Sequence, residues 1–350
     1  MAYTTIDDPS AFFQTVLYTG NGSDGYSITN DGNSDLQPDW LWFKNRNDTQ
    51  VHQLFDTNRG IANALRSNAT TVENTDDPND RLTAINSDGF TLGDDGNPNT
   101  NSNTYVCWQW KANGGTTASN SDGDITSTVQ ANTTAGFSIV TYTGNGNDGD
   151  TVGHGLSGNW DLCILKNRGQ TDYWTFSTTG TNQVLLLHDN VNQANHSTAY
   201  MTKASGVIGL VNAGDLGMVN NSSENYVAYV FKEVQGYSKF GNYTGNGNAD
   251  GAFVYTGFKP AWVMAKRTDA GSSNWMMFDS KRDTFNVMDS YVVAHADQAE
   301  ADFNFVDFLS NGFKWRHTSG HANASGGTYV YMAFAERPFV TSKGVPTTAR

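Results

Sequence analysis

Residue types that favour helices and disulfide frameworks are scarce in this chain. Only five of the 35 acidic residues are glutamate, which leaves 30 aspartates, and cysteine occurs twice in 350 residues. The first residues have neither the basic start nor the apolar stretch of a secretory leader. No segment approaches the roughly 20 apolar residues of a transmembrane helix. We therefore expect little helix, no signal peptide and no membrane span.

The two cysteines, Cys107 and Cys163, lie inside apolar runs typical of strands. They occupy different positions of the internal repeat described below, so a shared disulfide framework is not expected. Two single buried thiols are the prediction.

The charge balance excludes a further class of partner. The formal net charge is −14, which is unsuited to a broad nucleic-acid or anionic-membrane surface. Asparagine, aspartate, glycine, serine and threonine favour turns, and the aromatic residues, 12% of the chain, fall largely in short alternating runs. This composition predicts an all-β fold with long polar loops.

The pentapeptide Tyr-Thr-Gly-Asn-Gly occurs three times, beginning at Tyr18, Tyr142 and Tyr243. The copies start 142 − 18 = 124 and 243 − 142 = 101 residues apart, too far for a solenoid repeat of roughly 20–50 residues. We expect three tandem antiparallel β-sandwich units of the jelly-roll or concanavalin-like kind. Their expected limits are 1–115 for the first unit, 116–135 for a linker, 136–236 for the second unit, 237–340 for the third and 341–350 for a C-terminal tail.

Further blocks follow the pentapeptide in each copy. An apolar run ends in a basic pair, which predicts a strand buried on both faces with its charges paired at the strand end. An Asp/Arg pair comes next in two copies, at Asp56/Arg59 and Asp279/Arg282, and is absent from the middle copy. A structural pair can be lost from one copy whereas a shared active site cannot, so we interpret this pair as structural. The closing strand of each unit is expected beside its first strand.

The sequence contains no recognisable catalytic constellation. It lacks two carboxylates at strand spacing for glycoside hydrolysis, a Gly-x-Ser-x-Gly elbow and a phosphate-binding loop. We therefore expect no enzymatic activity and no cofactor. Candidate ligands for calcium are the aspartates that follow the pentapeptide: Asp24, Asp148 and Asp250.

The blocks together resemble a recurrent domain family of unknown function found in virion structural proteins of tailed bacteriophages, especially marine and cyanobacterial ones. The resemblance covers nearly the whole chain and implies a part of the virion, without catalytic residues to transfer. A tail fibre, receptor-binding protein or tail-associated appendage is the expectation, with a head decoration protein or a free carbohydrate-binding lectin as alternatives. A virion protein needs no signal peptide, because it leaves the host cytoplasm inside the particle.

The same resemblance implies partners. They are other virion proteins, host surface polysaccharide and further copies in a three- or six-fold homo-oligomer. The variable excursions at residues 59–81 and 284–304 are where recognition would reside. Trp315 is the expected exposed aromatic, and with Arg316 and His317 it forms the candidate ligand site.

Overall fold

Strands form where β-branched and aromatic residues concentrate, and the fold is all-β, as predicted. The computed structural model describes residues 2–75, 81–94, 96–197, 199–213 and 218–348. Within these ranges the helical segments are the single turn η1 (Pro9–Ala11) and the four-residue α1 (Gly96–Asn99).

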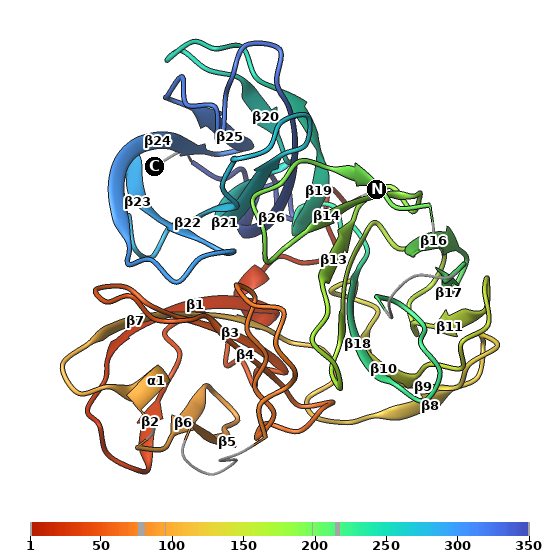
Figure 1. Cartoon of the computed structure of the whole chain (residues 1–350). Helices are drawn as coiled ribbons and strands as arrows, with labels where there is room; N and C mark the ends of the chain where they lie inside the picture. The colour runs from red at the N-terminus through yellow and green to blue at the C-terminus, as the bar shows by residue number, and fades with distance from the viewer. Residues whose placement is uncertain (1, 76–80, 95, 198, 214–217, 349–350) are drawn as a thin grey trace.

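Three lobes surround a common centre (Figure 1), and each contains one copy of the pentapeptide. We call them the first, second and third units. Each has an inner sheet with the same order: the first strand, the closing strand, the strand with the basic end, and the strand after it. These strands are β1 (Phe13–Thr19), β7 (Thr104–Trp110), β3 (Trp40–Asn45) and β4 (Gln53–Asp56); β10 (Phe137–Thr143), β18 (Asn225–Phe231), β12 (Leu162–Asn167) and β13 (Trp174–Ser177); and β19 (Ser238–Thr244), β26 (Thr328–Pro338), β21 (Phe258–Arg267) and β22 (Met276–Asp279).

A smaller outer sheet packs on each inner sheet and completes a sandwich. In the first two units the outer strands form a separate sheet of three strands. In the third unit the outer strands follow β22 within the same sheet, which has eight strands in all. The outer strands are β2 (Tyr26–Ile28), β6 (Phe90–Leu92) and β5 (Leu82–Ile85); β11 (Thr151–Gly153), β17 (Val207–Val211) and β16 (Tyr200–Ala204); and β23 (Met288–Val293), β24 (Ala301–Leu309), β25 (Gly312–Trp315) and β20 (Phe253–Tyr255).

The expected neighbours in each inner sheet are confirmed. The first and closing strands pair antiparallel in all three units. All residues of β3 and β12 are buried, as predicted for strands covered on both faces. Cys107 and Cys163 are also buried and unpaired, as predicted.

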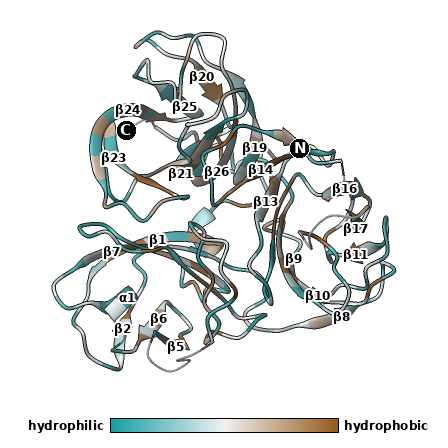
Figure 2. Ribbon diagram, viewed as in Figure 1, coloured by the Kyte–Doolittle hydropathy of each residue, from teal (hydrophilic) through white to brown (hydrophobic). Residues whose placement is uncertain are grey.

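Each inner sheet contributes to two hydrophobic cores at once. One face of β3 presents Leu41 and Phe43 to the core of its own sandwich, and the other presents Trp40 and Trp42 to a central core shared by the three units. Side chains alternate between the faces of a strand, so one continuous apolar run supplies both cores. The hydropathy colouring shows the corresponding hydrophobic strands facing the centre of the molecule (Figure 2).

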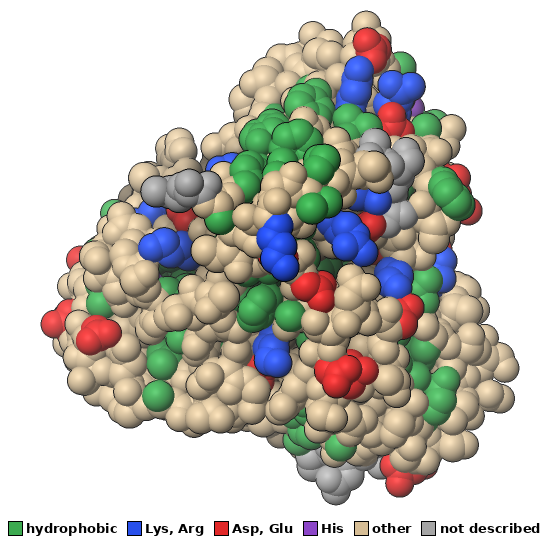
Figure 3. All heavy atoms as spheres, turned by 180° about the vertical axis from the view of Figure 1, so that it is seen from behind, with side chains coloured by type: hydrophobic (Ala, Val, Ile, Leu, Met, Phe, Trp, Pro, Cys, Tyr) green, Lys and Arg blue, Asp and Glu red, His purple; other side chains and the backbone are tan. Residues whose placement is uncertain are grey.

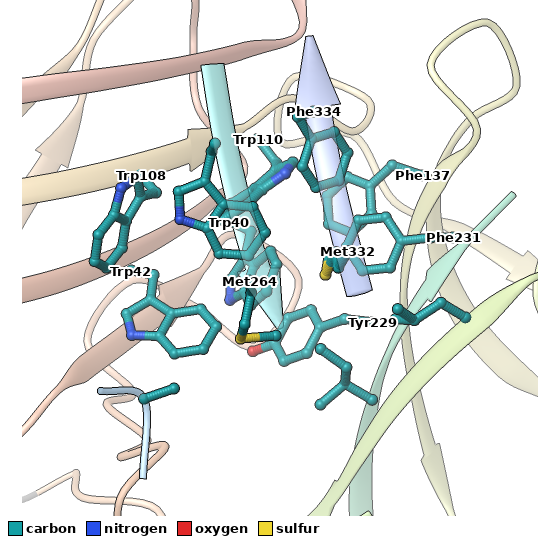
Figure 4. Close-up of a cluster of buried hydrophobic side chains, with 14 of the residues drawn as sticks. Trp40, Trp42, Trp108, Trp110, Phe137, Tyr229, Phe231, Met264, Met332 and Phe334 are labelled. Carbon is teal, nitrogen blue, oxygen red and sulfur yellow. The ribbon is translucent and has the colours of Figure 1, made fainter. Parts of the chain in front are cut away.

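The central core is rich in aromatic residues, and its contacts cross the boundaries between units (Figure 4). Trp40 of the first unit stacks on Tyr229 of the second, with ring centroids 4.3 Å apart. The ring centroid of Phe334 in the third unit lies 5.2 Å from that of Phe13 in the first unit and 5.8 Å from that of Phe231 in the second. The three units therefore share one interior.

The linker prediction for residues 116–135 is wrong. This segment contains β8 (Ala118–Asn120) and β9 (Ser127–Asn132), and β9 pairs along the outer edge of β10. Its Gly-, Ser- and Thr-rich composition resembles a flexible connection, but Val129 packs in the core of the second unit and Gln130 is fully buried. β9 and β8 thus extend the second unit's inner sheet beyond β10. At the opposite edge, β14 (Gln183–Leu186) and β15 (Ala194–Asn195) extend it beyond β13.

Two other segments expected to be loops also have regular contacts. The excursion at 284–304 includes β23 and the beginning of β24, which pair with each other. The excursion at 59–81 lies partly outside the described residues. In the tail, Val340 forms a bridge with Pro346 and Thr347 N donates to Phe339 O; residues 349–350 lie outside the described part of the chain.

The pentapeptide is a structural turn held by a buried asparagine. In the first unit, Asn99 accepts from Asn21 N at 2.9 Å and donates through Nδ2 to Asn21 Oδ1 and Ser23 O. Asn220 and Asn323 make the corresponding bonds in the other units. All three asparagines are fully buried.

Glycine is required at the third position of the pentapeptide by a close approach of the backbone. A Cβ atom at Gly20, Gly144 or Gly245 would lie 2.3 Å from the carbonyl oxygen of the residue that follows the buried asparagine. The pentapeptide tyrosine stacks on the first tyrosine of the closing strand, with centroids 5.1, 5.0 and 4.8 Å apart in the three units. The sequence repeat therefore marks a scaffold element.

Candidate functional site

The predicted ligand residues do not form a surface site for stacking. Trp315 is fully buried in the core of the third unit, so the prediction of an exposed aromatic is wrong. It lies on β25, where alternation places it on the same face as buried Phe313 and leaves Arg316 exposed. His317 packs edge-on against Phe303, with ring centroids 4.6 Å apart.

The three candidate calcium aspartates each have another partner and lie in separate units. Asp24 Oδ1 accepts from Gly25 N, and Asp148 Oδ1 accepts from Asn212 N. Asp250 forms an ion pair with Lys314 at 2.5 Å, and the hydrogen bond from Lys314 lowers the pKa of the Asp250 carboxyl. Over the ranges that the structure describes, no group of three or more histidine, cysteine or acidic residues is arranged to hold a metal ion.

The tryptophans are core residues. All nine have side chains that are at most 1% exposed. The large exposed aromatics are instead tyrosine and phenylalanine, with Phe285 the most exposed at 77%. On the face opposite to Figure 1, hydrophobic side chains gather over the third unit while lysine, arginine and acidic residues lie in small mixed groups (Figure 3).

The polar residues that sequence analysis singled out meet at the seams between units. At the seam of the first and third units, Arg46 binds Glu300 at 2.7 Å, and Glu300 also binds Arg282 at 3.0 Å. Arg282 in turn binds Asp279 at 2.6 Å, and neither of these two side chains is exposed. Trp108 of the first unit completes the chain by donating Nε1–H to Asp279.

The seam of the first and second units repeats this chain of contacts with equivalent residues. Arg168 binds Glu73 at 2.7 Å, Glu73 binds Arg59, and Arg59 binds Asp56. Tyr229 of the second unit donates its hydroxyl hydrogen to Asp56 at 2.7 Å. The Asp/Arg pair is therefore structural in both places, as interpreted, and it connects units.

The third seam, between the second and third units, has neutral residues at every position of this network. Thr268 replaces the first arginine, and Gln193 replaces the glutamate and keeps its backbone bond to Thr268 O at 2.9 Å. Thr178 and Thr181 stand where the Asp/Arg pair would be, and Met332 replaces the tryptophan or tyrosine donor. A buried charge left without its partner is costly, which explains why the charges are absent as a set.

A buried lysine ends the same strand in each unit. The Lys44, Lys166 and Lys266 side chains are fully buried, and their ammonium groups donate to backbone carbonyls, for example Lys44 to Asn45 O at 2.7 Å. Burial lowers the pKa of each of these lysines to about 8. The sequence predicted charge pairing at this end. The arginines Arg46, Arg168 and Arg267 make such pairs in the three units, whereas the lysines bind carbonyls.

A cavity of about 300 Å³ lies at the seam between the first and third units. Its wall from the first unit is β1 and the loop that follows β2, and its wall from the third unit combines β26 with the turn after β22. The lining residues are Ser10, Phe13, Gln14, Thr15, Asp31, Gly32, Asn33, Ala261, Ser280, Lys281, Thr284, Ala335, Glu336 and Arg337.

Sequence reasoning missed the buried asparagines and the seam glutamates. A signal for the asparagines exists, because each stands six residues before the first tyrosine of the closing strand, at Asn99, Asn220 and Asn323. The glutamates Glu73 and Glu300 lie in the variable excursions, where no local pattern points to a partner in another unit. The seam cavity has no sequence signal either, since its walls come from opposite ends of the chain.

Comparison with known proteins finds a matching family model. A family model described as "Domain of unknown function (DUF7483)" matches residues 8–338 as a single stretch. No curated protein matches the sequence. This match spans all three units, which agrees with their shared interior. No helix among the described residues is long and apolar enough to cross a membrane.

We predict that Asp279→Asn destabilises the protein by about 3–5 kcal/mol, because it leaves the buried Arg282 guanidinium without its closest carboxylate. The measurement is the free energy of unfolding in urea. Asp269→Asn is the matched control: Asp269 pairs with Arg267 at the third unit's surface, and its loss should cost only about 0–1 kcal/mol. Equal, small effects of both substitutions would contradict a structural role for the seam network.

We predict that the three buried lysines make stability rise with pH between about 8 and 10. Their folded pKa of about 8 lies below the unfolded value of about 10.4, so the unfolded chain binds more protons in this window. The buried thiols act in the opposite direction, since burial raises the pKa of Cys107 and Cys163. The measurement is therefore the difference in melting temperature between the wild type and the triple variant Lys44→Met, Lys166→Met, Lys266→Met. The difference should shift in favour of the wild type from pH 8 to 10, and a constant difference would show that these lysines do not titrate in this range.

Proposed function

Since the chain belongs to the family described as a domain of unknown function (DUF7483), whose description assigns no activity, we propose a function from its architecture. We propose that it is a non-enzymatic structural protein of a tailed-bacteriophage particle, exposed on the virion as a tail-associated or fibre-like appendage. Its partners in this proposal are other virion proteins, further copies of itself and host surface polysaccharide.

The contacts of the buried ionisable groups are the main support for the proposal. The acidic and basic side chains at the two charged seams bind one another across units, and the buried lysines bind backbone carbonyls. The repeated pentapeptide holds a turn, and the repeated tyrosines stack. A chain whose recurrent residues all stabilise a scaffold is typical of a structural part, and the resemblance noted from the sequence motifs points to the same class.

The lectin alternative receives no support from the aromatic residues. Sugar-binding modules stack sugars on exposed rings, and every tryptophan here is buried. Attachment to polysaccharide would then depend on the exposed phenylalanines and tyrosines, such as Tyr255 and Phe285, and on the polar loops. We retain host binding as part of the appendage proposal and do not propose a free lectin.

The test is the position of the protein in the particle. An antibody raised against the recombinant chain should label the tails of intact, gradient-purified phage that encode it, and mass spectrometry of the same particles should detect it in tens of copies or fewer. Labelling of the capsid surface would replace the appendage with a head decoration protein. Absence of the protein from purified particles would refute the virion proposal.

A further inference from the structure

We propose that the outer edge of β1, at the seam cavity, is a docking site for an extended segment of a partner polypeptide. The partner adds a strand to the first unit's inner sheet by main-chain hydrogen bonding. The inference does not depend on the virion assignment, because it follows from a comparison of the three units within this molecule.

The outer edge of β1 has no neighbouring strand in the described part of the chain, since β1 ends its sheet and pairs only with β7. Gly20 N donates to Asn103 O and Lys111 N donates to Phe12 O, so the even-numbered residues of β1 bond to β7. Antiparallel pairing alternates along a strand, and the backbone groups of Phe13 and Thr15 therefore point outward. They lie along the wall of the cavity.

In the second unit the equivalent edge is occupied. Alignment on the pentapeptide makes Phe13, Gln14 and Thr15 equivalent to residues 137, 138 and 139 of β10. Those three residues pair with Asn132, Ala131 and Gln130 of β9. The part of β1 that lines the cavity is thus the part that a strand covers in the second unit.

In the third unit the equivalent edge is closed by a side chain. Phe240 takes the position of Thr15, and its N–H donates to Glu233 Oε1 at 3.0 Å. Glu233 also forms an ion pair with Lys239. Two units therefore satisfy this edge internally, one with a strand and one with a carboxylate, and the first unit has a cavity in its place.

The opposite wall of the cavity also matches the surroundings of β9. Two side chains of the first unit bind β9: Thr57 donates to Gln130 Oε1 at 2.9 Å and Asn58 donates to Thr128 O at 3.0 Å. Ser280 and Lys281 hold the equivalent positions in the third unit, directly after the aspartate of the Asp/Arg pair, and both line the cavity. Each of these side chains carries a hydrogen-bond donor.

A third set of equivalent residues supplies acceptors. Asn132 Nδ2 donates to the carbonyl oxygens of Lys111 and Ala112, which follow the closing strand of the first unit, at 3.4 and 3.0 Å. The register of the closing strands makes Ala335 and Glu336 their counterparts in the third unit. Both counterparts line the cavity. The cavity therefore corresponds in position to the site that residues 130–132 occupy beside β10, and we call this position in the first unit the seat.

Two features favour an incoming strand at this cavity. The Thr15 side-chain oxygen is buried, and none of the described residues hydrogen-bonds it. Lys281 and Asp31 join the two walls by an ion pair whose side chains are 40% and 65% exposed. An exposed pair contributes little to stability, so it can separate for a ligand at small cost.

The occupant that fits is an extended segment with side-chain amides at two alternate positions and a small residue between them. Gln130 and Asn132 provide these amides in the second unit, with Ala131 between them. Main-chain bonds to Phe13 and Thr15 would give affinity, and the amides would select the partner through Ser280 and the carbonyls of 335 and 336.

The chain's own β9 sequence serves as the probe. A fluorescent synthetic peptide with the sequence of residues 126–134, Thr-Ser-Thr-Val-Gln-Ala-Asn-Thr-Thr, is titrated with the intact protein, and binding is followed by anisotropy. We expect saturable binding at micromolar to submillimolar concentration and slower hydrogen exchange of the Thr15 amide in the complex. A peptide with proline at the position of Gln130 should bind at least tenfold more weakly, because it lacks the main-chain donor.

Two matched protein variants locate the binding. Thr15→Pro removes the outward N–H within the cavity, whereas Thr19→Pro removes an outward N–H of the same strand beyond the cavity lining. Binding should weaken at least tenfold in the first variant and stay unchanged in the second. No binding to the wild type up to millimolar concentration, or equal binding to both variants, would overturn the proposal. Dimerisation of the wild type that Thr15→Pro abolishes would also overturn it, by assigning the seat to a second copy of the chain.

Discussion

The burial of aromatic rings between three inner sheets is the constraint on which the rest of the structure depends. Each inner sheet has an apolar face toward its own sandwich and another toward the centre, so no unit can cover all its hydrophobic surface alone. Trp40, Tyr229 and Phe334 come from three different units and meet within one core. Removing a unit would expose large rings to water, and the cost rises with the apolar area exposed. The repeated motifs thus describe one domain with internal repetition.

The seams show how such a domain tolerates divergence between its repeats. The central core sets the distance between the inner sheets, and the polar side chains at each seam only need to satisfy one another. Two seams do this with a buried chain of ions and an aromatic donor, and the third has the neutral residues Thr268, Gln193 and Thr178 at these positions. Exchange of one member alone would leave an uncompensated charge, so the neutral and ionic versions are alternative complete sets. The seam cavity differs from this case, because the equivalent sheet edge is covered in the second and third units and no described strand or carboxylate covers it in the first.

Much of the fold could be predicted from the sequence, because the strand signals are local. Continuous apolar runs identified β3 and β12 as strands buried on both faces, and the repeated blocks placed each first strand beside its closing strand. An apolar run such as Trp40–Asn45 shows that both faces of the strand are covered. It does not show which part of the chain covers each face, so what buries the second face of β3 was not predictable. The segment at 116–135 was misjudged because its polar residues, among them Gln130, are buried in hydrogen bonds to another unit. Trp315 was misjudged although its alternation with Phe313 gave the correct signal.

The most direct test of a single shared interior is differential scanning calorimetry of the whole chain. A shared interior predicts one cooperative transition in which the calorimetric enthalpy of unfolding equals the van't Hoff enthalpy, because the units cannot lose their common core separately. A calorimetric enthalpy about three times the van't Hoff value would mean three domains that unfold independently, and it would rule out a single shared interior.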